Sequence, residues 1–315
     1  MTSGVLLMSF GAVESVDDVG QYYTNIRGGK APAPAELLDL RRRYERIGGR
    51  SPLVDITRRQ ARALQAYLLR AGHDVQVEIG MRHWRPTVRD AVRNLVERGV
   101  RHIVGITSGP YDSNVSVASY ERLLAAAVRD VDPTLEFRLV RQWHDAPGLD
   151  QAWKVQFDTA TAEAGWSDGT CHVLFSAHSL PQRVMPLGDP YPGQFLNHAF
   201  RLARHLRLRS WGACYQSAGM TKEPWLGPDI LDALRALGDA GHRRVLSLPI
   251  GFCADHLEIL HDLDVEARQA AAQLGIDWRR APMPNDSEAF VEALANAVVP
   301  ELTLSGMTLG ATPHA

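Results

Sequence analysis

Residues 172–179 read HVLFSAHS, a short apolar run that ends in small and polar side chains. Runs of this kind recur along the chain, and a longer segment of helical periodicity follows each one. In the first half they are Val5–Gly11, Val75–His83, His102–Pro110 and Phe137–Asp145, and in the second they are His172–Ser179, Ser210–Ser217, Val245–Phe252 and Trp278–Asn285. Parallel strands need a long return connection, so strands that alternate with such helical segments predict parallel sheets with crossover helices.

Four units in each half predict an α/β protein with two similar domains, each built on a four-stranded parallel sheet flanked by helices. We expect the first domain to span residues 1–160 and the second to span residues 161–302. The segment Ala146–Thr170 between the two sets of strands is predicted to hold a bridging helix and a loop. Residues 303–315 lack periodicity and are expected to form a flexible tail.

Composition excludes several classes of protein. The 315 residues include 34 basic and 36 acidic side chains, and 45% are hydrophobic, which is typical of a folded globular chain. This charge balance argues against a nucleic-acid partner and against a polybasic membrane-surface binder. The three cysteines are few, odd in number and form no CxxC pair. We therefore expect no disulfide framework and no iron–sulfur cluster. Without a signal peptide or an apolar run of the ~18 residues that a membrane span requires, we expect a soluble, cytoplasmic protein with no stable membrane insertion.

The candidate sites are the segments that follow the apolar runs, because ligands of open parallel sheets bind beyond the carboxyl ends of the strands. None of these segments carries a phosphate-binding GxGxxG or GxxxxGKS/T loop, or the GxSxG elbow of a hydrolase. His178 lies at the end of its run, where an imidazole can act as a base or a metal ligand. A lone histidine is more often a surface or core residue, so its position alone favours the structural reading.

The segment 251–267 reads GFCADHLEILHDLDVEA and combines a strand end with a row of acids. Glu258, Asp262 and Glu266 lie at positions i, i+4 and i+8 of the predicted helix, on one face, where like charges repel unless cations or protons offset them. The row is either a solvated acidic face or a path that leads outward from Glu258 and carries protons or a hydrated cation. His256 and His261 flank the row, and we expect both to be structural.

Arginine is unusually frequent, with 31 of the 34 basic residues, and eight arginines lie within residues 27–59. Guanidinium groups suit the forked recognition of carboxylates or phosphates. Arg43, Arg46 and Arg50 lie around the end of a short helix that the glycines at 48–49 are expected to close. Two readings stay open here: an anion-binding lid, or a solvated helix whose arginines pair with neighbouring acids.

Six sequence blocks occur in the order of one known family. They are SFGAVES, YYTNIRGGKAP, RRYERIGGRSPL, SAHSLPQRV with GDPY, PWLGPDI and GFCADHLEILHDLDVEA. From about Val5 to Pro300 the chain resembles the ferrochelatases, specifically the bacterial (monoderm) type that acts in coproporphyrin-dependent haem synthesis. The resemblance implies two Rossmann-like domains with a porphyrin cleft between them, and a lyase that takes Fe²⁺ as a substrate.

The resemblance also implies roles for individual residues. His178 and Glu258 are the expected catalytic and metal-binding pair, and Asp262 and Glu266 the expected outer site for protons, Mg²⁺ or another hydrated divalent cation. The expected porphyrin contacts are Phe10, Arg27, Arg43, Tyr44, Ser51 and Tyr120.

Phe10 departs from relatives that carry an iron-ligating tyrosine in this loop, and its ring has no oxygen to offer the product iron. Phe10 and His178 follow equivalent strands of the two halves, so we expect them to face opposite sides of one porphyrin. Trp84, Tyr120 and Trp225 are further candidates for the walls of the cleft.

Insertion of Fe²⁺ into a free-base porphyrin releases two pyrrole protons, so the site needs a proton acceptor near the ring and a route for iron. We expect His178 to be the principal base and ligand and Glu258 its partner, and the sequence leaves open which of them takes the proton and which first binds iron. An arginine-rich lid suits coproporphyrin III, which has four propionates, better than protoporphyrin, which has two.

Three alternatives stay open. The first is a protoporphyrin IX ferrochelatase at a membrane, which would need an apolar lip. The second is a non-enzymatic protein that binds a metal chelate, and the third is a chelatase for cobalt or nickel, because imidazole and carboxylate do not select Fe²⁺ by affinity. In the favoured reading the protein is a monomer that binds coproporphyrin III and Fe²⁺ and makes transient contacts with downstream haem-synthesis enzymes.

Overall fold

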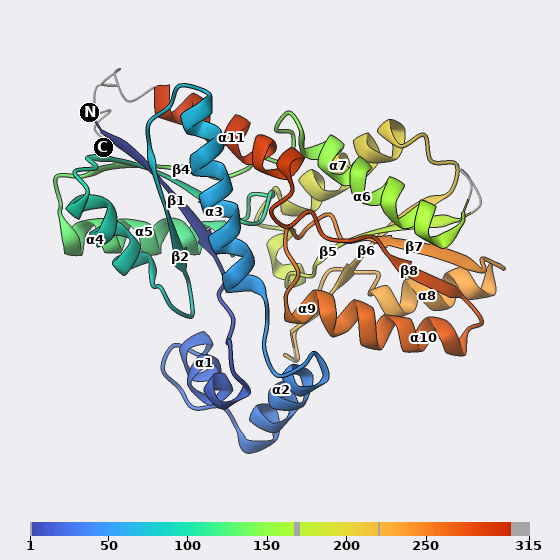
Figure 1. The fold of residues 1–315 in the computed structure, drawn as a ribbon. Coiled ribbons are helices and arrows are strands. Elements are labelled where there is room, and N and C mark those ends of the chain that lie inside the picture. The colour runs from blue at the N-terminus through green and yellow to red at the C-terminus, as the bar shows by residue number, and fades with distance from the viewer. Residues whose placement is uncertain (1, 167–170, 220, 304–315) are drawn as a thin grey trace.

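The computed structural model describes residues 2–166, 171–219 and 221–303, which form two parallel four-stranded sheets (Figure 1). The first sheet has the order β2-β1-β3-β4 and consists of β1 (Ser3–Ser9), β2 (Gln76–Met81), β3 (His102–Thr107) and β4 (Glu136–Val140). The second has the order β6-β5-β7-β8 and consists of β5 (His172–His178), β6 (Trp211–Gln216), β7 (Arg244–Leu248) and β8 (Asp277–Arg280). The two sheets therefore repeat one topology, and the predicted α/β fold of two Rossmann-like domains is confirmed.

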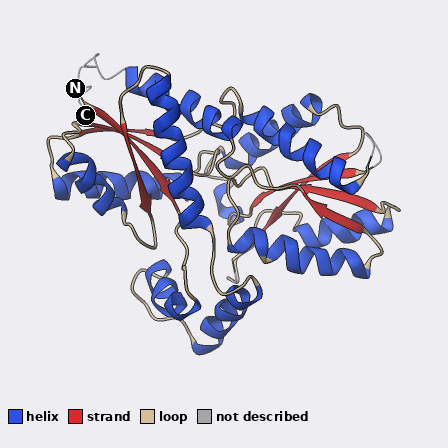
Figure 2. Cartoon of the chain, viewed as in Figure 1, coloured by secondary structure: helices blue, strands red, loops and turns tan. Residues whose placement is uncertain are grey.

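Helices cover both faces of the first sheet, which explains why its central strands are apolar along their whole length. Leu6 and Met8 of β1 pack against α4 (Val88–Glu97) and α5 (Val117–Val131), whereas Val5 and Leu7 point to the opposite face and the core beneath α3 (Leu53–Arg70). Every residue of β3 is buried. Figure 2 shows the same sandwich of helix, sheet and helix in both halves of the molecule.

The second sheet is covered by α6 (Leu149–Ala164) and α7 (Tyr191–His205) on one face, and by α8 (Ile230–Asp239) and α10 (Arg268–Gln273) on the other (Figure 1). A short 3₁₀ turn, η2 (Gln182–Val184), lies between β5 and α7.

Two helices connect the halves. The predicted bridging helix is α6, which packs on β7 and β8 of the second sheet. The last helix, α11 (Glu288–Thr303), returns to the first half and packs against α3, β3 and β4. Gly148, at the start of α6, also lies against α11, where an added Cβ would approach the amide nitrogen of Ala293 to 3.4 Å. The domain boundary near residue 160 stays a prediction, and the expected tail lies outside the described residues apart from Thr303.

A two-helix excursion leaves the carboxyl end of β1 and stands apart from both sheets (Figure 1). It consists of a 3₁₀ turn, η1 (Val16–Asp18), then α1 (Val19–Ile26) and α2 (Pro34–Arg46). Proline at the first position of α2 favours the start of a helix. Gly48 and Gly49 follow its end with φ values of +93° and +82°, which is the expected glycine closure.

The segment after β7 differs from the expected regular helix. A short α9 (Leu257–Leu260) is followed by a π-helical segment, Asp262–Ala267, and only then by α10. Within the π segment the amide of Glu266 donates to the carbonyl of His261, five residues earlier, at 3.0 Å. The wider turn changes which side chains share a face, so Glu258, Asp262 and Glu266 do not form the regular i, i+4, i+8 row that a continuous α-helix would give.

Candidate active site

A cavity of about 520 Å³ lies between the two domains, at the carboxyl ends of their strands. β1 lies between β2 and β3, and β5 lies between β6 and β7. The connections that follow the central strand and its neighbour therefore run to opposite faces of each sheet, and a crevice forms at the carboxyl end of the central strand. Phe10 follows β1 and His178 ends β5, and both line the cavity. The described lining also includes Ser9, Tyr22, Tyr23, Arg43, Tyr44, Arg82, Ser108, Tyr120, Ser217, Phe252, His256, Glu258 and Asp262.

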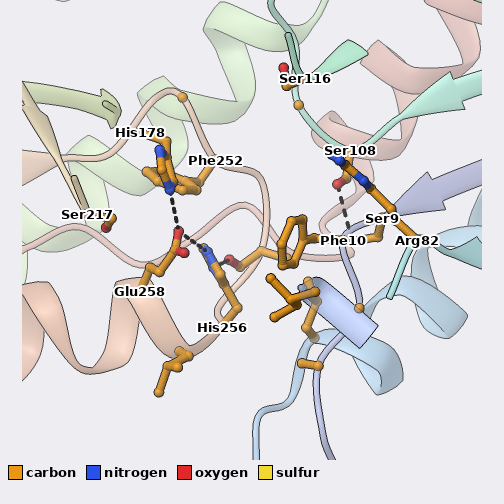
Figure 3. A pocket seen from close by; sticks show the side chains of 18 of the residues that line it. Ser9, Phe10, Arg82, Ser108, Ser116, His178, Ser217, Phe252, His256 and Glu258 are labelled. Atoms are coloured by element: carbon orange, nitrogen blue, oxygen red, sulfur yellow. Dashed lines mark hydrogen bonds and ion pairs between the residues drawn. The ribbon is translucent and has the colours of Figure 1, made fainter. Parts of the chain in front are cut away.

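His178 and Glu258 face each other across the second-domain side of the cavity (Figure 3). The Nε2 atom of His178 lies 3.6 Å from Oε2 of Glu258, and about a third of each side chain is exposed. Nδ1 of His178 donates to the carbonyl of Ser179 at 2.5 Å, which turns Nε2 towards the carboxylate. The hydroxyl of Tyr191, in the first turn of α7, donates to the backbone carbonyl of His178 at 2.9 Å and holds the strand end in place.

A glycine lets the loop after β7 approach the end of β5. A Cβ on Gly251 would lie 2.5 Å from the Cβ of Ala177, so only glycine fits this approach. The amide of Gly251 donates to the carbonyl of Ser176 at 3.0 Å. Because this loop leads directly to Glu258, the close contact places the carboxylate opposite His178.

The two charges stabilise each other in a recessed site. Burial lowers the pKa of His178, but the negative charge of Glu258 outweighs it and raises that pKa to about 9. Burial raises the pKa of Glu258, and the charge and hydrogen bond of His178, with a further contribution from His256, bring it well below its ordinary value. These shifts favour an imidazolium and a carboxylate at neutral pH.

His256 lies beside this pair, although the helical spacing placed it off the face of the acidic row. Its Nε2 lies 3.5 Å from Oε2 of Glu258, and its Nδ1 donates to the carbonyl of Ala254 at 3.0 Å. His256 precedes α9 in an extended conformation, so its side chain does not follow the helical spacing from which its role was inferred. The ring of Phe252 lies beside both imidazoles, with its centroid 6.3 Å from His178 and 5.1 Å from His256.

A second acidic cluster contains Asp262 and Glu266 and also includes His261, which the helical spacing placed off the face of the acidic row. Nδ1 of His261 lies 3.2 Å from Oδ1 of Asp262 and 3.8 Å from Oε1 of Glu266. One ligand atom from each of the three residues lies within 4.8 Å of the others, a spacing that could hold a metal ion. The π-helical turn brings His261 beside the acids, which a regular helix of the predicted phase would not do.

Asp262 connects this outer cluster to the cavity. Oδ2 of Asp262 accepts a hydrogen bond from the hydroxyl of Ser217 at 2.5 Å, and both residues line the cavity. Ser217 follows β6 with a φ of +60°, and its neighbour Gln216 donates to the carbonyl of Glu258 at 3.1 Å. Arg46 of α2 lies on the other side of the cluster, with Nη1 3.5 Å from Nε2 of His261. The excursion thus reaches the second domain.

Four of the six expected porphyrin contacts line the cavity: Phe10, Arg43, Tyr44 and Tyr120. Phe10 is 39% exposed, unusual for a phenylalanine, and its ring lies 4.6 Å from that of His83. Arg43 pairs with Asp39 of its own helix at 2.9 Å.

The other two expected contacts are not among the described lining residues. Arg27 follows α1 and pairs with Glu36 at 3.2 Å. Ser51 is buried, and its amide donates to the carbonyl of Val13 at 3.0 Å. Of the three aromatic wall candidates, Tyr120 lines the cavity, while Trp84 and Trp225 are absent from its described lining.

Solved structures share this architecture. SirB from Bacillus subtilis, solved with Fe³⁺, superposes with a TM-score of 0.60 over 97% of this chain and 98% of its own, at 11% sequence identity. CbiX, described as the terminal enzyme of sirohaem biosynthesis in denitrifying bacteria, reaches a TM-score of 0.53 over 94% of this chain and 97% of its own, at 14% identity. At these identities the likeness establishes a shared fold.

Sequence comparisons identify the family. The ferrochelatase family model matches residues 2–302. A ferrochelatase of Herpetosiphon aurantiacus is 39% identical over 299 residues, covering 94% of this chain and 98% of its own. A coproporphyrin III ferrochelatase of Geobacillus kaustophilus is 39% identical over 303 residues, covering 95% of each.

This chain belongs to the ferrochelatase family, as its six sequence blocks predicted, and is an enzyme of haem biosynthesis that inserts a metal into a porphyrin, with Fe²⁺ as the family's metal substrate. None of the described helices is both long and apolar enough to cross a bilayer.

Proposed function

We propose that this enzyme inserts Fe²⁺ into coproporphyrin III and that His178 and Glu258 carry out the insertion. The observation that supports this assignment is the facing imidazole and carboxylate, 3.6 Å apart, in the cavity between the domains. Several relatives that match nearly the whole chain bear the name coproporphyrin III ferrochelatase.

The protonation of the pair suggests the order of events. At neutral pH His178 holds a proton, because the nearby Glu258 raises its pKa to about 9. Fe²⁺ must displace that proton to bind Nε2, since a metal ligand must be deprotonated. Once the proton of His178 has passed to water, the ionised Glu258 accepts the two pyrrole protons in turn and passes the first one on before it takes the second, with Nε2 of His256 at 3.5 Å. In this scheme His178 acts first as the metal ligand and Glu258 as the first base.

The outer cluster gives the protons a way out. We propose that Asp262, Glu266 and His261 form an exit path and hold a hydrated divalent cation such as Mg²⁺ at its end. The hydrogen bond from Ser217 to Asp262 supports a connection to the cavity, and the spacing of the three ligand atoms supports cation binding.

Charge supports coproporphyrin III as the organic substrate. Arg27 and Arg43 on the excursion pair with Glu36 and Asp39, but all four side chains are about one third to one half exposed, and exposed pairs contribute little stability. These guanidinium groups can therefore exchange their partners for propionates at small cost. The geometry of Arg–carboxylate pairs favours this role.

A side-by-side insertion assay tests the choice of substrate. Under anaerobic conditions with Fe²⁺, we expect kcat/KM to be about tenfold or more higher for coproporphyrin III than for protoporphyrin IX, because of the extra charge-assisted contacts. Repeating the assay with Zn²⁺ controls for iron oxidation. A preference for protoporphyrin IX with both metals would refute the proposed substrate.

We also propose that the enzyme works as a monomer in the cytoplasm, without an iron–sulfur cluster and with transient contacts to downstream haem-synthesis enzymes. The three cysteines are buried and lie on separate segments, at positions 171, 214 and 253, which supports the absence of a cluster. Light scattering and an absorbance spectrum of the purified protein test the first and third of these points.

A further inference from the structure

Arg82 is a cationic residue of the cavity wall to which the proposed chemistry assigns no role. It follows β2 directly, and its amide donates to the carbonyl of Ser9 at 2.9 Å, which fixes the backbone at the end of β1. Its side chain lines the cavity on the first-domain side, opposite the group formed by His178, Glu258 and His256 (Figure 3).

The guanidinium of Arg82 lies between two aromatic rings. Its Cζ atom is 5.5 Å from the ring centroid of Tyr120 and 5.9 Å from that of Phe10. Both distances are within the range of cation–π attraction, which orients a guanidinium without neutralising its charge. Since the two rings belong to different segments, they hold the charged group at the wall of the cavity.

No carboxylate among the described residues lies within ion-pair distance of Arg82, in contrast to Arg43, which pairs with Asp39. The adjacent His83 does not compensate the charge either. Burial and the charge of Arg82 lower the pKa of His83 to about 4, so His83 is neutral at physiological pH. A recessed cation without an anion is a favourable site for an anionic ligand group, because little desolvation of a competing partner is required.

The same wall carries hydroxyl groups. Ser9, Ser108 and Ser116 line it, and the hydroxyl of Ser108 donates to that of Ser9 at 3.3 Å. Hydroxyls can donate to the oxygens of a carboxylate that a guanidinium holds. The wall around Arg82 therefore offers a charge and short polar side chains, while the second-domain wall offers the groups for metal and protons.

We propose that Arg82 binds a propionate carboxylate of the porphyrin, at a wall of the cavity separate from Arg27 and Arg43 of the excursion, and thereby selects a ring with four carboxylates. This inference rests on the proposed function. The propionates of coproporphyrin III extend from all four pyrroles, whereas the two of protoporphyrin IX lie on adjacent pyrroles at one edge. A ring with a carboxylate on every pyrrole offers carboxylates to the excursion and to Arg82 in more orientations than a ring with both carboxylates at one edge.

Two substitutions separate charge from packing. Arg82→Met keeps an unbranched apolar stem between the rings of Phe10 and Tyr120 but removes the charge, and Arg82→Ala removes both. Arg89→Ala is the matched control, because Arg89 lies on the neighbouring α4, is 56% exposed and approaches Asp130 only to 4.0 Å.

Porphyrin binding without metal, measured by quenching of porphyrin or tryptophan fluorescence, gives the primary readout. Both Arg82 variants should raise the Kd for coproporphyrin III by about tenfold or more and the Kd for protoporphyrin IX by less than about threefold, with kcat largely unchanged. Arg89→Ala should leave both Kd values at the wild-type level.

Three outcomes would overturn the role of Arg82. In the first, coproporphyrin III binds both variants as tightly as it binds wild type. In the second, the Kd values of both porphyrins rise by the same factor. In the third, Arg82→Met keeps the affinity that Arg82→Ala loses, which would show that packing and not charge matters. A wild-type preference for protoporphyrin IX would instead refute the proposed substrate, and a His178 variant with normal turnover would refute the proposed chemistry. These two results come from the wild-type enzyme and from a His178 variant, so they are distinct from any result obtained with the Arg82 variants.

Discussion

The carboxyl ends of β1 and β5 occupy the same place in two copies of one topology, yet they carry different chemistry. Phe10 follows β1, and its ring lies close to the ring of His83 and to the guanidinium of Arg82. His178 ends β5 and faces Glu258 and a connected row of acids. The comparison shows that a repeated scaffold can supply two walls of a single cavity, one for the ring and its substituents and the other for the metal and protons.

The difference follows from the neighbours of each strand end. Beside β5, the loop that Gly251 brings close delivers a carboxylate, and two imidazoles can share its charge. Beside β1, the neighbouring segments deliver rings, hydroxyls and one guanidinium. Position in the fold creates the crevice, and the side chains of adjacent segments determine its reactivity.

The strongest test of this comparison removes one side chain from each strand end. We expect His178→Ala to lower kcat for Fe²⁺ or Zn²⁺ insertion by at least about 10²-fold while porphyrin binding persists, since it removes the metal ligand. Phe10→Leu should instead act mainly on KM, because it alters only the surface against the ring. Stopped-assay kinetics and fluorescence quenching measure both. Near-normal turnover of His178→Ala would contradict the division between the walls.

The second test concerns pH. The folded-state pKa of His178 is raised to about 9, so its proton is bound at neutral pH and is lost only as pH rises through that value. Metal that displaces this proton should bind about tenfold more tightly for each pH unit up to about 9. Glu258→Gln removes the charge that raises the pKa, and burial then lowers it, so the rise should end at lower pH.

Zinc titrations between pH 6 and pH 9.5, together with NMR titration of His178, measure this shift. Asp277→Asn, an exposed change on the rim of the second sheet, is the matched control and should leave the profile unchanged. An identical profile in wild type and Glu258→Gln would show that the pair is not coupled. The ion pair should also stabilise the fold below the unfolded pKa of about 6.5 and lose that contribution as pH rises through about 9.

The smallest expected effect comes from giving the end of β1 a possible metal ligand, as the end of β5 already has in His178. Phe10→Tyr adds a phenol oxygen on the wall opposite His178, where it could ligate the iron of the product. We expect a few-fold lower kcat through slower product release and a changed absorbance spectrum of the ferric product complex. Phe10→Leu, with no oxygen, provides the comparison. An unchanged spectrum would place the ring of residue 10 too far from the iron.

The strands were predictable because each is a short, continuous apolar run, and such runs mark strands buried on both faces. His178 and Glu258 could be nominated because they directly follow strands. The contacts of His256 and His261 with the acids could not be predicted, because regular helical spacing was assumed through a segment that is extended at His256 and π-helical from Asp262. A warning was present in the like charges at 258, 262 and 266, which disfavour a regular helix.

Arg82 directly follows a strand, and this position was the only feature of the sequence that could have nominated it as a cavity residue. Its setting between Phe10 and Tyr120 depends on residues 72 and 38 positions away in the chain, which no local pattern relates. Ser217 was missed for the same reason, because its partner Asp262 belongs to another strand connection.

The sequence by itself determined the class of fold, the repetition of the strand units and the family, because apolar periodicity and ordered motifs are local properties of the chain. Only the tertiary structure decided which strand ends meet, which histidines lie beside the carboxylates and which arginine of the described cavity lining has no carboxylate within ion-pair distance. The physical reason is that hydrogen bonds, ion pairs and pKa shifts depend on distances of a few ångströms. Packing of the two sheets and the α1–α2 excursion sets those distances.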